Sequence, residues 1–156
     1  MRLSTLGRYA LRAMVDLAMQ SSQSPTLRQE IAERQEISSN YLAQLFLKLR
    51  RAGLVRSVLG PGGGYVLAKS ASEISAGDVL RAVKEPLAPV YCVDDEQRDR
   101  CHRADGCPTR ALWTKLGQQI TQTLDSTTLA DLCEQPSKVV GESSAPEEGQ
   151  AIQSTR

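Results

Sequence analysis

Residues 37–65 have the sequence ISSNYLAQLFLKLRRAGLVRSVLGPGGGY, and this stretch decides the fold. Ser38 is a favourable N-cap for a helix, and the apolar residues after it follow the i, i+3, i+4, i+7 spacing of one buried face. These apolar residues are Leu42, Leu45, Phe46 and Leu49. Gly53 permits the left-handed conformation that commonly ends a helix. The pattern therefore predicts an amphipathic helix between Ser38 and Gly53.

Two β-prone segments follow this helix. They are Leu54–Leu59 and Tyr65–Ala68, and the sequence Gly-Pro-Gly-Gly-Gly at positions 60–64 joins them. Two such segments joined by a glycine-rich turn predict a β-hairpin. The turn lacks the Gly-Lys-Ser/Thr ending of a nucleotide-binding loop, so we do not expect it to bind ATP. A plain turn is one explanation of these glycines, and a hairpin tip that approaches a phosphate or groove wall closely is the favoured one.

The segments before residue 37 predict two further helices. In the first, the apolar residues lie on one stripe: Leu6, Ala10, Ala13, Met14, Leu17 and Ala18. The stretch Ser22–Pro25 interrupts this pattern, and Leu27–Glu33 predicts a short second helix. Helix, short helix, turn, helix and hairpin, in that order, is the plan of a winged helix-turn-helix. The predicted fold class is therefore mainly α with a small β-hairpin.

The second half of the chain predicts two more helices. Ser75–Val83 predicts a fourth helix, which Pro86 and Pro89 end. Pro108 suits the first position of a long helix that extends to about Leu124. Large aliphatic residues repeat along one side of this helix: Leu112, Leu116, Ile120 and Leu124. Core packing would explain this side, but little chain remains to cover it, so we expect a homodimer interface.

Charge is distributed unevenly along the chain. Residues 1–69 contain ten Lys/Arg and four Asp/Glu, whereas residues 70–156 contain nine and fourteen. A basic N-terminal half favours a polyanionic partner such as nucleic acid, although an ordinary protein can also have two faces of opposite charge. Charged residues interrupt the apolar positions of residues 3–19, which argues against a signal peptide. No apolar run approaches membrane-spanning length, so we expect a cytoplasmic protein that does not bind a membrane.

The outward side of the helix after Ser38 carries polar and basic side chains suited to DNA. Asn40 and Gln44 can each present the donor and acceptor pair that matches adenine in the major groove. Basic side chains near the end of the helix and on the hairpin would contact phosphates, with an affinity that falls with salt. The predicted DNA-binding residues are Ser38, Ser39, Asn40, Tyr41, Gln44, Lys48, Arg51, Arg56, Gly62 and Gly63. A merely solvated polar face is the alternative, which the hairpin and the helix order disfavour.

Three of the four cysteines occur in one polar loop, at about residues 90–107. Eight residues separate Cys92 from Cys101, and five separate Cys101 from Cys107. In a reducing compartment, clustered thiols more often bind metal or carry out redox chemistry than form structural disulfides. Iron–sulfur clusters are held by thiolates, so we expect these three cysteines to hold one. Cys133 stands alone in the sequence and is interpreted as a small apolar residue.

Two alternatives to a cluster remain open for this loop. Zinc bound by the three thiols and His102 would have four ligands. However, adjacent residues such as Cys101 and His102 rarely bind one tetrahedral metal. A thiol-based redox switch without metal is the other alternative.

Five segments of the chain match a known family. They are MRLSTLGRYA at 1–10, ISSNYL at 37–42, LFLKL at 45–49, GPGGGY at 60–65 and CPTRALW at 107–113. These segments resemble the winged-helix transcription factors of the IscR, NsrR, RirA and CymR family, and the similarity covers about residues 1–135. The resemblance implies a homodimer that binds a palindromic DNA operator. It also implies a [2Fe–2S] or [4Fe–4S] cluster whose state controls DNA binding.

The chain departs from the cluster-binding members of this family at several positions. The first gap between the cysteines is wider than in IscR, as in RirA-type members, and Arg110 occupies the position of a cluster-ligating histidine. Arg8 occupies the position of an acidic ligand used by other members. The fourth ligand and the cluster type therefore stay open, with His102 as a candidate ligand. Ala43 replaces a glutamate and Leu59 replaces an arginine, so the operator preference of IscR is not carried over.

Three regions and one function follow from these observations. We expect a winged helix-turn-helix DNA-binding region over residues 1–85, a cysteine loop with a dimerisation helix over residues 86–133, and a disordered tail over residues 134–156. The expected function is a homodimeric DNA-binding regulator controlled by an iron–sulfur cluster. No Ser/His/Asp set or nucleotide loop suggests an enzyme. The alternatives are a zinc or thiol switch, or a CymR-like regulator that acts through a partner enzyme.

Overall fold

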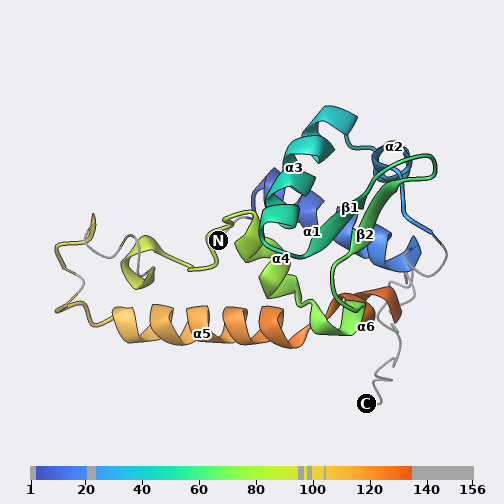
Figure 1. Ribbon diagram of the computed structural model, residues 1–156. Coiled ribbons are helices and arrows are strands. Elements are labelled where there is room, and N and C mark those ends of the chain that lie inside the picture. The colour runs from blue at the N-terminus through green and yellow to red at the C-terminus, as the bar shows by residue number, and fades with distance from the viewer. Residues whose placement is uncertain (1–2, 21–23, 95–96, 98–99, 104, 135–156) are drawn as a thin grey trace, which may run out of the picture.

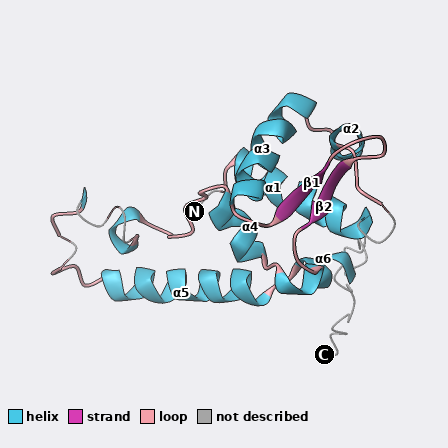
Figure 2. Ribbon diagram, viewed as in Figure 1, coloured by secondary structure: helices cyan, strands magenta, loops and turns pink. Residues whose placement is uncertain are grey.

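Figure 1 shows the fold of the computed structural model, which describes residues 3–20, 24–94, 97, 100–103 and 105–134. The described residues form, in order, α1 (Thr5–Gln20), α2 (Arg28–Gln35), α3 (Ser39–Arg51), β1 (Val55–Val58), β2 (Gly64–Leu67), η1 (Ala71–Glu73), α4 (Ala76–Ala82), η2 (Tyr91–Val93), α5 (Arg110–Ser126) and α6 (Leu129–Glu134). Helices dominate, and the two strands form one antiparallel hairpin (Figure 2). The predicted fold class is confirmed.

The core of the winged-helix region lies between α1 and α3. The apolar stripe predicted for α1 is buried at Ala10, Ala13, Met14 and Leu17. The predicted face of α3 is buried at Leu42, Leu45, Phe46 and Leu49. Burial of each large apolar side chain stabilises the fold by about 1.5–3 kcal/mol, so these two faces hold the helices together. The short helix α2 joins the same core through Ile31 and Ala32.

Buried charge in this region is paired. Asp16 of α1 is buried, and its carboxylate accepts hydrogen bonds from Arg34 at 2.8 Å and from Gln35 at 3.0 Å. The hydrogen bond that Arg34 donates to Asp16 is the main reason why the pKa of Arg34 is raised above its usual value. This ion pair joins the middle of α1 to the end of α2, next to the tight turn that leads into α3.

The two ends of α3 form as the sequence predicts. The hydroxyl of Ser38 accepts a hydrogen bond from the backbone N–H of Tyr41 at 3.2 Å. Gly53 follows the helix in the left-handed conformation, with φ of 72°. The direction of α3 is therefore fixed at both ends by local interactions.

The hairpin follows α3 directly and packs against it. Val55 pairs with Leu67 and Val58 pairs with Gly64, one residue away from the predicted limits of the strands. The ring of Tyr65 stacks on Phe46 at 4.3 Å between centroids. The stacking of Tyr65 on Phe46 therefore holds the hairpin on the core close to its glycine-rich turn.

The end of α4 is fixed to the start of α1. Lys84 has a left-handed backbone with φ of 60°, and the N–H of Glu85 donates to the carbonyl of Leu80 at 3.0 Å. This turn directs the buried Glu85 carboxylate to Ser4, whose backbone N–H donates to it at 2.6 Å and whose hydroxyl also donates to it. Gly7 lies against the same carboxylate, where a side chain would collide with it. The segment that leads into the cysteine loop is thus anchored to the winged-helix region.

The C-terminal helices differ from the sequence prediction in two respects. Thr109 is the N-cap of α5, so the helix begins at Arg110 rather than at Pro108, which lies in the preceding turn. The helix α6 was not predicted, and its Leu129 is fully buried in the core of the winged-helix region. Glu134, which the prediction assigned to the tail, is the last residue of α6, and the rest of the predicted tail, 135–156, lies outside the described residues.

The lone cysteine lies on α6. Cys133 is half-buried and lies 3.9 Å from the carbonyl oxygen of Val15 on α1. Burial raises the pKa of its thiol, which keeps it protonated and apolar in character. None of the described helices is long and apolar enough to cross a membrane.

Candidate nucleic-acid interface and cysteine loop

One stripe of α3 points away from the core. It contains Asn40, Gln44, Leu47 and Arg51, which are exposed and spaced by three or four residues. Because residues at this spacing lie above one another on a helix, they form a continuous outward face. Lys48 lies beside this face and is half-buried. The structure therefore places the predicted Asn40, Gln44 and Arg51 together on an accessible surface.

The hydroxyls at the start of α3 hold the local structure. Ser38 caps the helix, and the hydroxyl of Ser39 accepts a hydrogen bond from Nε of Arg28 at 3.0 Å. Arg28 begins α2, so this bond joins the starts of two helices. Arg28 is not among the predicted DNA-binding residues, although the available sequence signal was a basic residue at the start of the second helix.

Tyr41 is held by a neighbouring ring. It is half-buried and packs edge-to-face on Tyr9 of α1, with 5.7 Å between ring centroids. The guanidinium of Arg12 lies 5.5 Å from the centre of the Tyr9 ring. A phosphate that reached the Tyr41 hydroxyl would meet a side chain whose position is already fixed.

The tip of the hairpin is a tight turn. The N–H of Gly63 donates to the carbonyl of Gly60 at 2.9 Å, and Gly62 has φ of 74°. With Pro61 at the second position, this is the arrangement of a type II turn. Gly63 is buried, and an added Cβ would lie 2.3 Å from the Val58 carbonyl oxygen. Gly62 is exposed at the tip, whereas Gly63 is needed by the turn itself.

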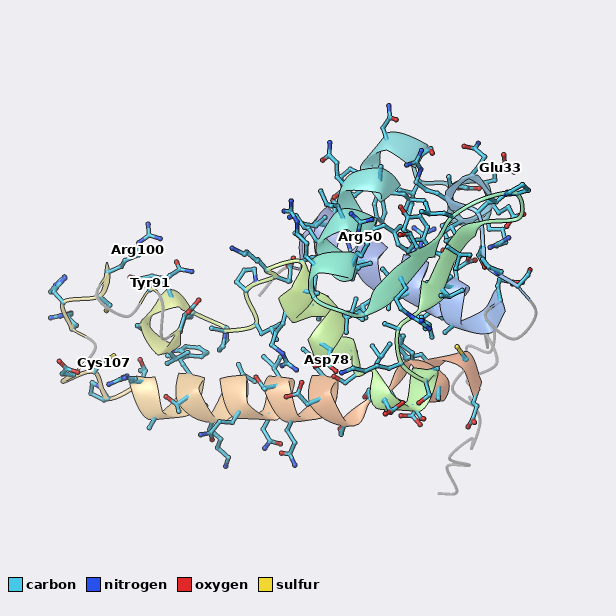
Figure 3. All side chains as sticks on the ribbon, viewed as in Figure 1. Glu33, Arg50, Asp78, Tyr91, Arg100 and Cys107 are labelled. Carbon is cyan, nitrogen blue, oxygen red and sulfur yellow. The ribbon has the colours of Figure 1, made fainter. Side chains whose placement is uncertain are left out.

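Basic side chains gather at the end of α3 and on β1. Arg51 and Arg56 are exposed, and Arg50 donates to the hydroxyl of Ser57 at 3.4 Å. Figure 3 shows Arg50 on α3 next to the hairpin. The cations therefore flank the outward face of α3, which is the arrangement that phosphates on either side of a groove require.

The predicted ligand residues lie at the opposite end of the molecule. Cys92 belongs to η2, whereas Cys101 and Cys107 lie in the loop that leads to α5, and all three are half-buried free thiols. Figure 3 shows Cys107 at the start of α5, away from Arg50 and α3. Among the described residues, no group of three or more Cys, His, Asp or Glu side chains lies close enough to hold a metal ion. The described part of the loop therefore does not bring the predicted ligands, including His102, into one site.

Cys107 has the electrostatic surroundings of a ligand. Its sulfur lies 3.2 Å from the hydroxyl of Thr109. Hydrogen bonding with Thr109, and to a smaller extent the charge of Arg103, lowers the pKa of the Cys107 thiol. A hollow of about 400 Å³ lies beside it, lined in part by His102 and Pro108. A thiolate is the form that binds iron or zinc, so the donor chemistry suits a soft metal centre.

Comparison with known proteins identifies the family. The sequence profile of the Rrf2 family, described as an iron-dependent transcriptional regulator, matches residues 3–135. The chain belongs to the Rrf2 family. It is 48% identical over 132 residues to the HTH-type transcriptional regulator IscR of Pectobacterium carotovorum subsp. carotovorum, a match that covers 85% of this chain and 79% of that protein.

Solved structures of Rrf2 proteins agree with this assignment. The fold is similar to that of CymR, the global cysteine regulator of B. subtilis, with a TM-score of 0.71 and 39% identity over 85% of this chain and 96% of that one. It is also similar to T. potens IscR, with a TM-score of 0.69 and 39% identity over 85% of each chain. The predicted family resemblance is confirmed. This Rrf2 protein is a DNA-binding transcriptional regulator with a winged-helix fold, and it is not an enzyme.

The long helix α5 of this Rrf2 protein has one apolar side that the rest of the described chain leaves exposed. None of its described side chains is buried, and Leu112 and Leu116 are 59% and 41% exposed. Its C-terminal part is anchored by an ion pair between Arg81 and Asp125 at 2.7 Å, and η2 and Pro89 also lie against the helix. Just after α5, the backbone carbonyl of Thr127 accepts a hydrogen bond from the N–H of Ala76 at 2.8 Å.

Proposed function

We propose that this Rrf2 protein is a homodimer whose binding to a palindromic operator is controlled by an iron–sulfur cluster. Cys92, Cys101 and Cys107 hold the cluster. The observation that carries the proposal is the set of three free, half-buried thiols on one segment between α4 and α5. The similarity to IscR regulators supports it. Because the protein acts on DNA, we place it in the cytoplasm.

The exposed apolar side of α5 supports the homodimer. Leu112 and Leu116 expose large apolar surface, and Ile120 and Leu124 continue the same side at half-buried positions. Two copies of this helix that pack against each other would bury the leucines of both chains. Such a dimer presents two α3 helices, and a symmetric pair of helices matches a palindromic operator.

The recognition helix of this dimer is α3. Its outward face would enter the major groove, where Asn40 and Gln44 hydrogen-bond to base edges while Lys48, Arg51 and Arg56 contact phosphates. The exposed tip around Gly62 would reach the neighbouring backbone. Gln44→Ala is then expected to weaken binding to the operator more than binding to random DNA, and equal losses on both would remove Gln44 from the base-contacting set.

The attachment of the cysteine loop supports coupling between cluster and DNA. At one end, the loop starts from the Glu85 anchor on α1. At the other, it continues into α5, whose far end is held by Arg81 and Asp125. A change in the loop around a cluster would change how α5 meets its partner and hence the spacing of the two α3 helices. Half-sites on one DNA face lie roughly 34 Å apart, so a shift of a few ångströms would weaken binding.

The bound cluster would supply a centre that changes its state with iron, oxygen or nitric oxide. With three protein thiolates, a fourth position is left for His102 or for an exchangeable ligand. The surroundings of Cys107 favour its thiolate, because Thr109 lowers its pKa. The experiment below distinguishes a [2Fe–2S] from a [4Fe–4S] cluster.

The test is an anaerobic visible spectrum of freshly purified protein, with iron and acid-labile sulfide counted per chain. We expect a brown protein, and its stoichiometry will identify the cluster type. Serine substitution of Cys92, Cys101 or Cys107 is expected to abolish the colour, whereas Cys133→Ser, on α6, is the matched control that keeps it. Visible absorbance retained in all three loop variants contradicts the proposed ligands.

The remaining alternatives correspond to other results of the same experiment. A colourless protein after anaerobic reconstitution that contains zinc favours a zinc site, and one without metal favours a thiol switch. Equal operator affinity with and without the cluster contradicts cluster control. In that case, capture of an enzyme by the intact dimer without DNA would favour a CymR-like mode of action.

A further inference from the structure

A leucine lies in the middle of the polar face of α3. Leu47 is 40% exposed and belongs to the same stripe as Asn40, Gln44 and Arg51. At 3.6 residues per turn, these four positions fall within an arc of about 60° around the helix axis. Leu47 is therefore surrounded by the side chains that are best placed to contact DNA bases.

The protein core does not explain this leucine. The sequence neighbours of Leu47 on α3, namely Leu45, Phe46 and Leu49, are buried and form the side that faces the core. Leu47 is absent both from the core cluster and from the partly buried residues packed against it, among the residues that the structure describes. Ala43, one turn earlier, is half-buried on the adjacent part of the helix. An apolar strip of two residues thus runs through a polar surface.

We propose that Leu47, assisted by Ala43, contacts the 5-methyl groups of thymines in the operator. The proposal rests on α3 being the recognition helix. In the major groove, the distinguishing apolar group that a base pair presents is the methyl group of thymine. Contact between a leucine and the thymine methyl group stabilises the complex. Any other base at this position would lose the water that hydrogen-bonds to its polar edge and gain no partner from the leucine. Leu47 is therefore a specificity-determining residue that selects thymine.

The surrounding charge favours DNA over a second copy of this face. Arg51 lies one turn further on the same stripe, and Arg50, Lys48 and Arg56 lie around it. A second copy of this face would bring like charges together, which disfavours contact between two copies. A duplex offers phosphates to these cations and methyl groups to Leu47 in the same docking arrangement.

The experiment uses the full-length protein and a duplex that it selects from a random library. Each thymine of that duplex is replaced in turn by deoxyuridine, which removes only the 5-methyl group. We expect one or two thymines in each half-site to lose affinity by roughly three- to tenfold, the effect of one buried methyl group. Uniform affinity across all thymine-to-deoxyuridine duplexes would overturn the proposal without the need for any protein variant.

Protein variants attribute the effect to Leu47. Leu47→Ala is expected to bind duplexes with thymine and with deoxyuridine at those positions with equal affinity. Leu47→Met keeps an apolar side chain and is expected to retain most of the preference for thymine. Met19→Ala removes a comparable apolar group, 52% exposed at the end of α1, and is expected to behave as the unaltered protein. An unchanged deoxyuridine pattern in Leu47→Ala rejects Leu47 as the contacting residue.

Gln44→Ala separates failure of this inference from failure of the proposed recognition helix. If Gln44→Ala loses specificity while Leu47→Ala keeps the full methyl dependence, α3 contacts the bases and only the assignment of Leu47 is wrong. If neither variant changes specificity, α3 is not the recognition helix, and both proposals fail.

Discussion

The winged-helix region and the long helix α5 use their apolar side chains in opposite ways. Every buried apolar side chain of the described chain lies within residues 10–83, except Leu129 of α6. In α5 no described side chain is buried, although the helix has a continuous apolar side. The first region therefore completes its core within one chain. The second leaves its apolar side exposed in a single chain, as the proposed homodimer requires.

Polar groups show the same difference. In the winged-helix region, the buried carboxylates of Asp16 and Glu85 are held by hydrogen bonds from Arg34 and Ser4. No buried side-chain nitrogen or oxygen in the described part of the chain lacks a hydrogen-bond partner. The thiols of the cysteine loop, by contrast, are not gathered into a site by the protein alone. The winged-helix region is therefore structurally fixed, whereas the cysteine loop is left for the proposed cluster to organise.

The largest expected effect comes from deleting a core ring. Phe46 is fully buried and stacks on Tyr65, so Phe46→Ala is expected to lower the free energy of unfolding by about 3–5 kcal/mol. Leu112→Ala removes an exposed side chain, so in the proposed homodimer it is expected to act only through association of the two chains. Urea denaturation over a range of protein concentrations measures both.

The two variants are distinguished by concentration. The loss in Phe46→Ala is expected at every protein concentration, whereas that in Leu112→Ala shrinks to within about 0.5 kcal/mol once the unaltered protein is monomeric. A loss in Leu112→Ala that does not depend on concentration would mean that α5 packs within its own chain.

A smaller effect is expected at the anchor of the cysteine loop. Glu85→Gln replaces one acceptor oxygen of the buried carboxylate by an amide NH₂ beside Ser4, so we expect a loss of about 1–3 kcal/mol in the free energy of unfolding. Glu33→Gln, at an exposed position of α2, is the matched control and is expected to stay within about 0.5 kcal/mol. Equal stability of the two variants would show that the anchor contributes nothing.

Two helix caps then separate stability from DNA binding. Ser38→Ala and Ser75→Ala each remove a hydroxyl that accepts a backbone N–H, and each is expected to cost about 1 kcal/mol by urea denaturation. Only Ser38 lies at the start of α3, so only Ser38→Ala is expected to weaken operator binding as well. A similar loss of binding in Ser75→Ala would attribute the effect to stability rather than to position.

The smallest effect is a difference in thiol reactivity between the two regions. The thiolate reacts with iodoacetamide, and its fraction at a given pH rises as the pKa falls. Thr109 lowers the pKa of Cys107, and burial raises the pKa of Cys133. We therefore expect iodoacetamide to alkylate Cys107 before Cys133 in metal-free protein at neutral pH. Mass spectrometry over time measures the order of alkylation. Thr109→Val should slow Cys107 alone, and reversal of the order would contradict both assignments.

Local patterns were enough to predict the winged helix. The spacing of Leu42, Leu45, Phe46 and Leu49, the cap at Ser38 and the glycines after Leu59 each specify a short-range structure that the fold contains. The start of α5 was placed two residues early, because Pro108 suits a helix start as well as the turn it occupies.

Contacts between distant segments could not be predicted in this way. Ser4 and Glu85 are 81 residues apart, and no spacing rule joins them. The helix α6 is too short to show a clear period, and it is stabilised by the burial of Leu129 against distant residues. The exposure of Leu47 could not be predicted either, because a leucine on an amphipathic helix ordinarily belongs to the core. The predicted ligand set of the cysteine loop stays a prediction.

The contact between Gly7 and Glu85 limits how this sequence can evolve. A Cβ at position 7 would lie 2.8 Å from the Glu85 carboxylate oxygen, so any larger residue there displaces the carboxylate from Ser4. A shorter acid at position 85 would make room, but it would no longer reach Ser4 unless the start of α1 moved. Positions 7 and 85 are therefore expected to change together among descendants of this protein, as a coevolving pair that joins the first helix to the root of the cysteine loop.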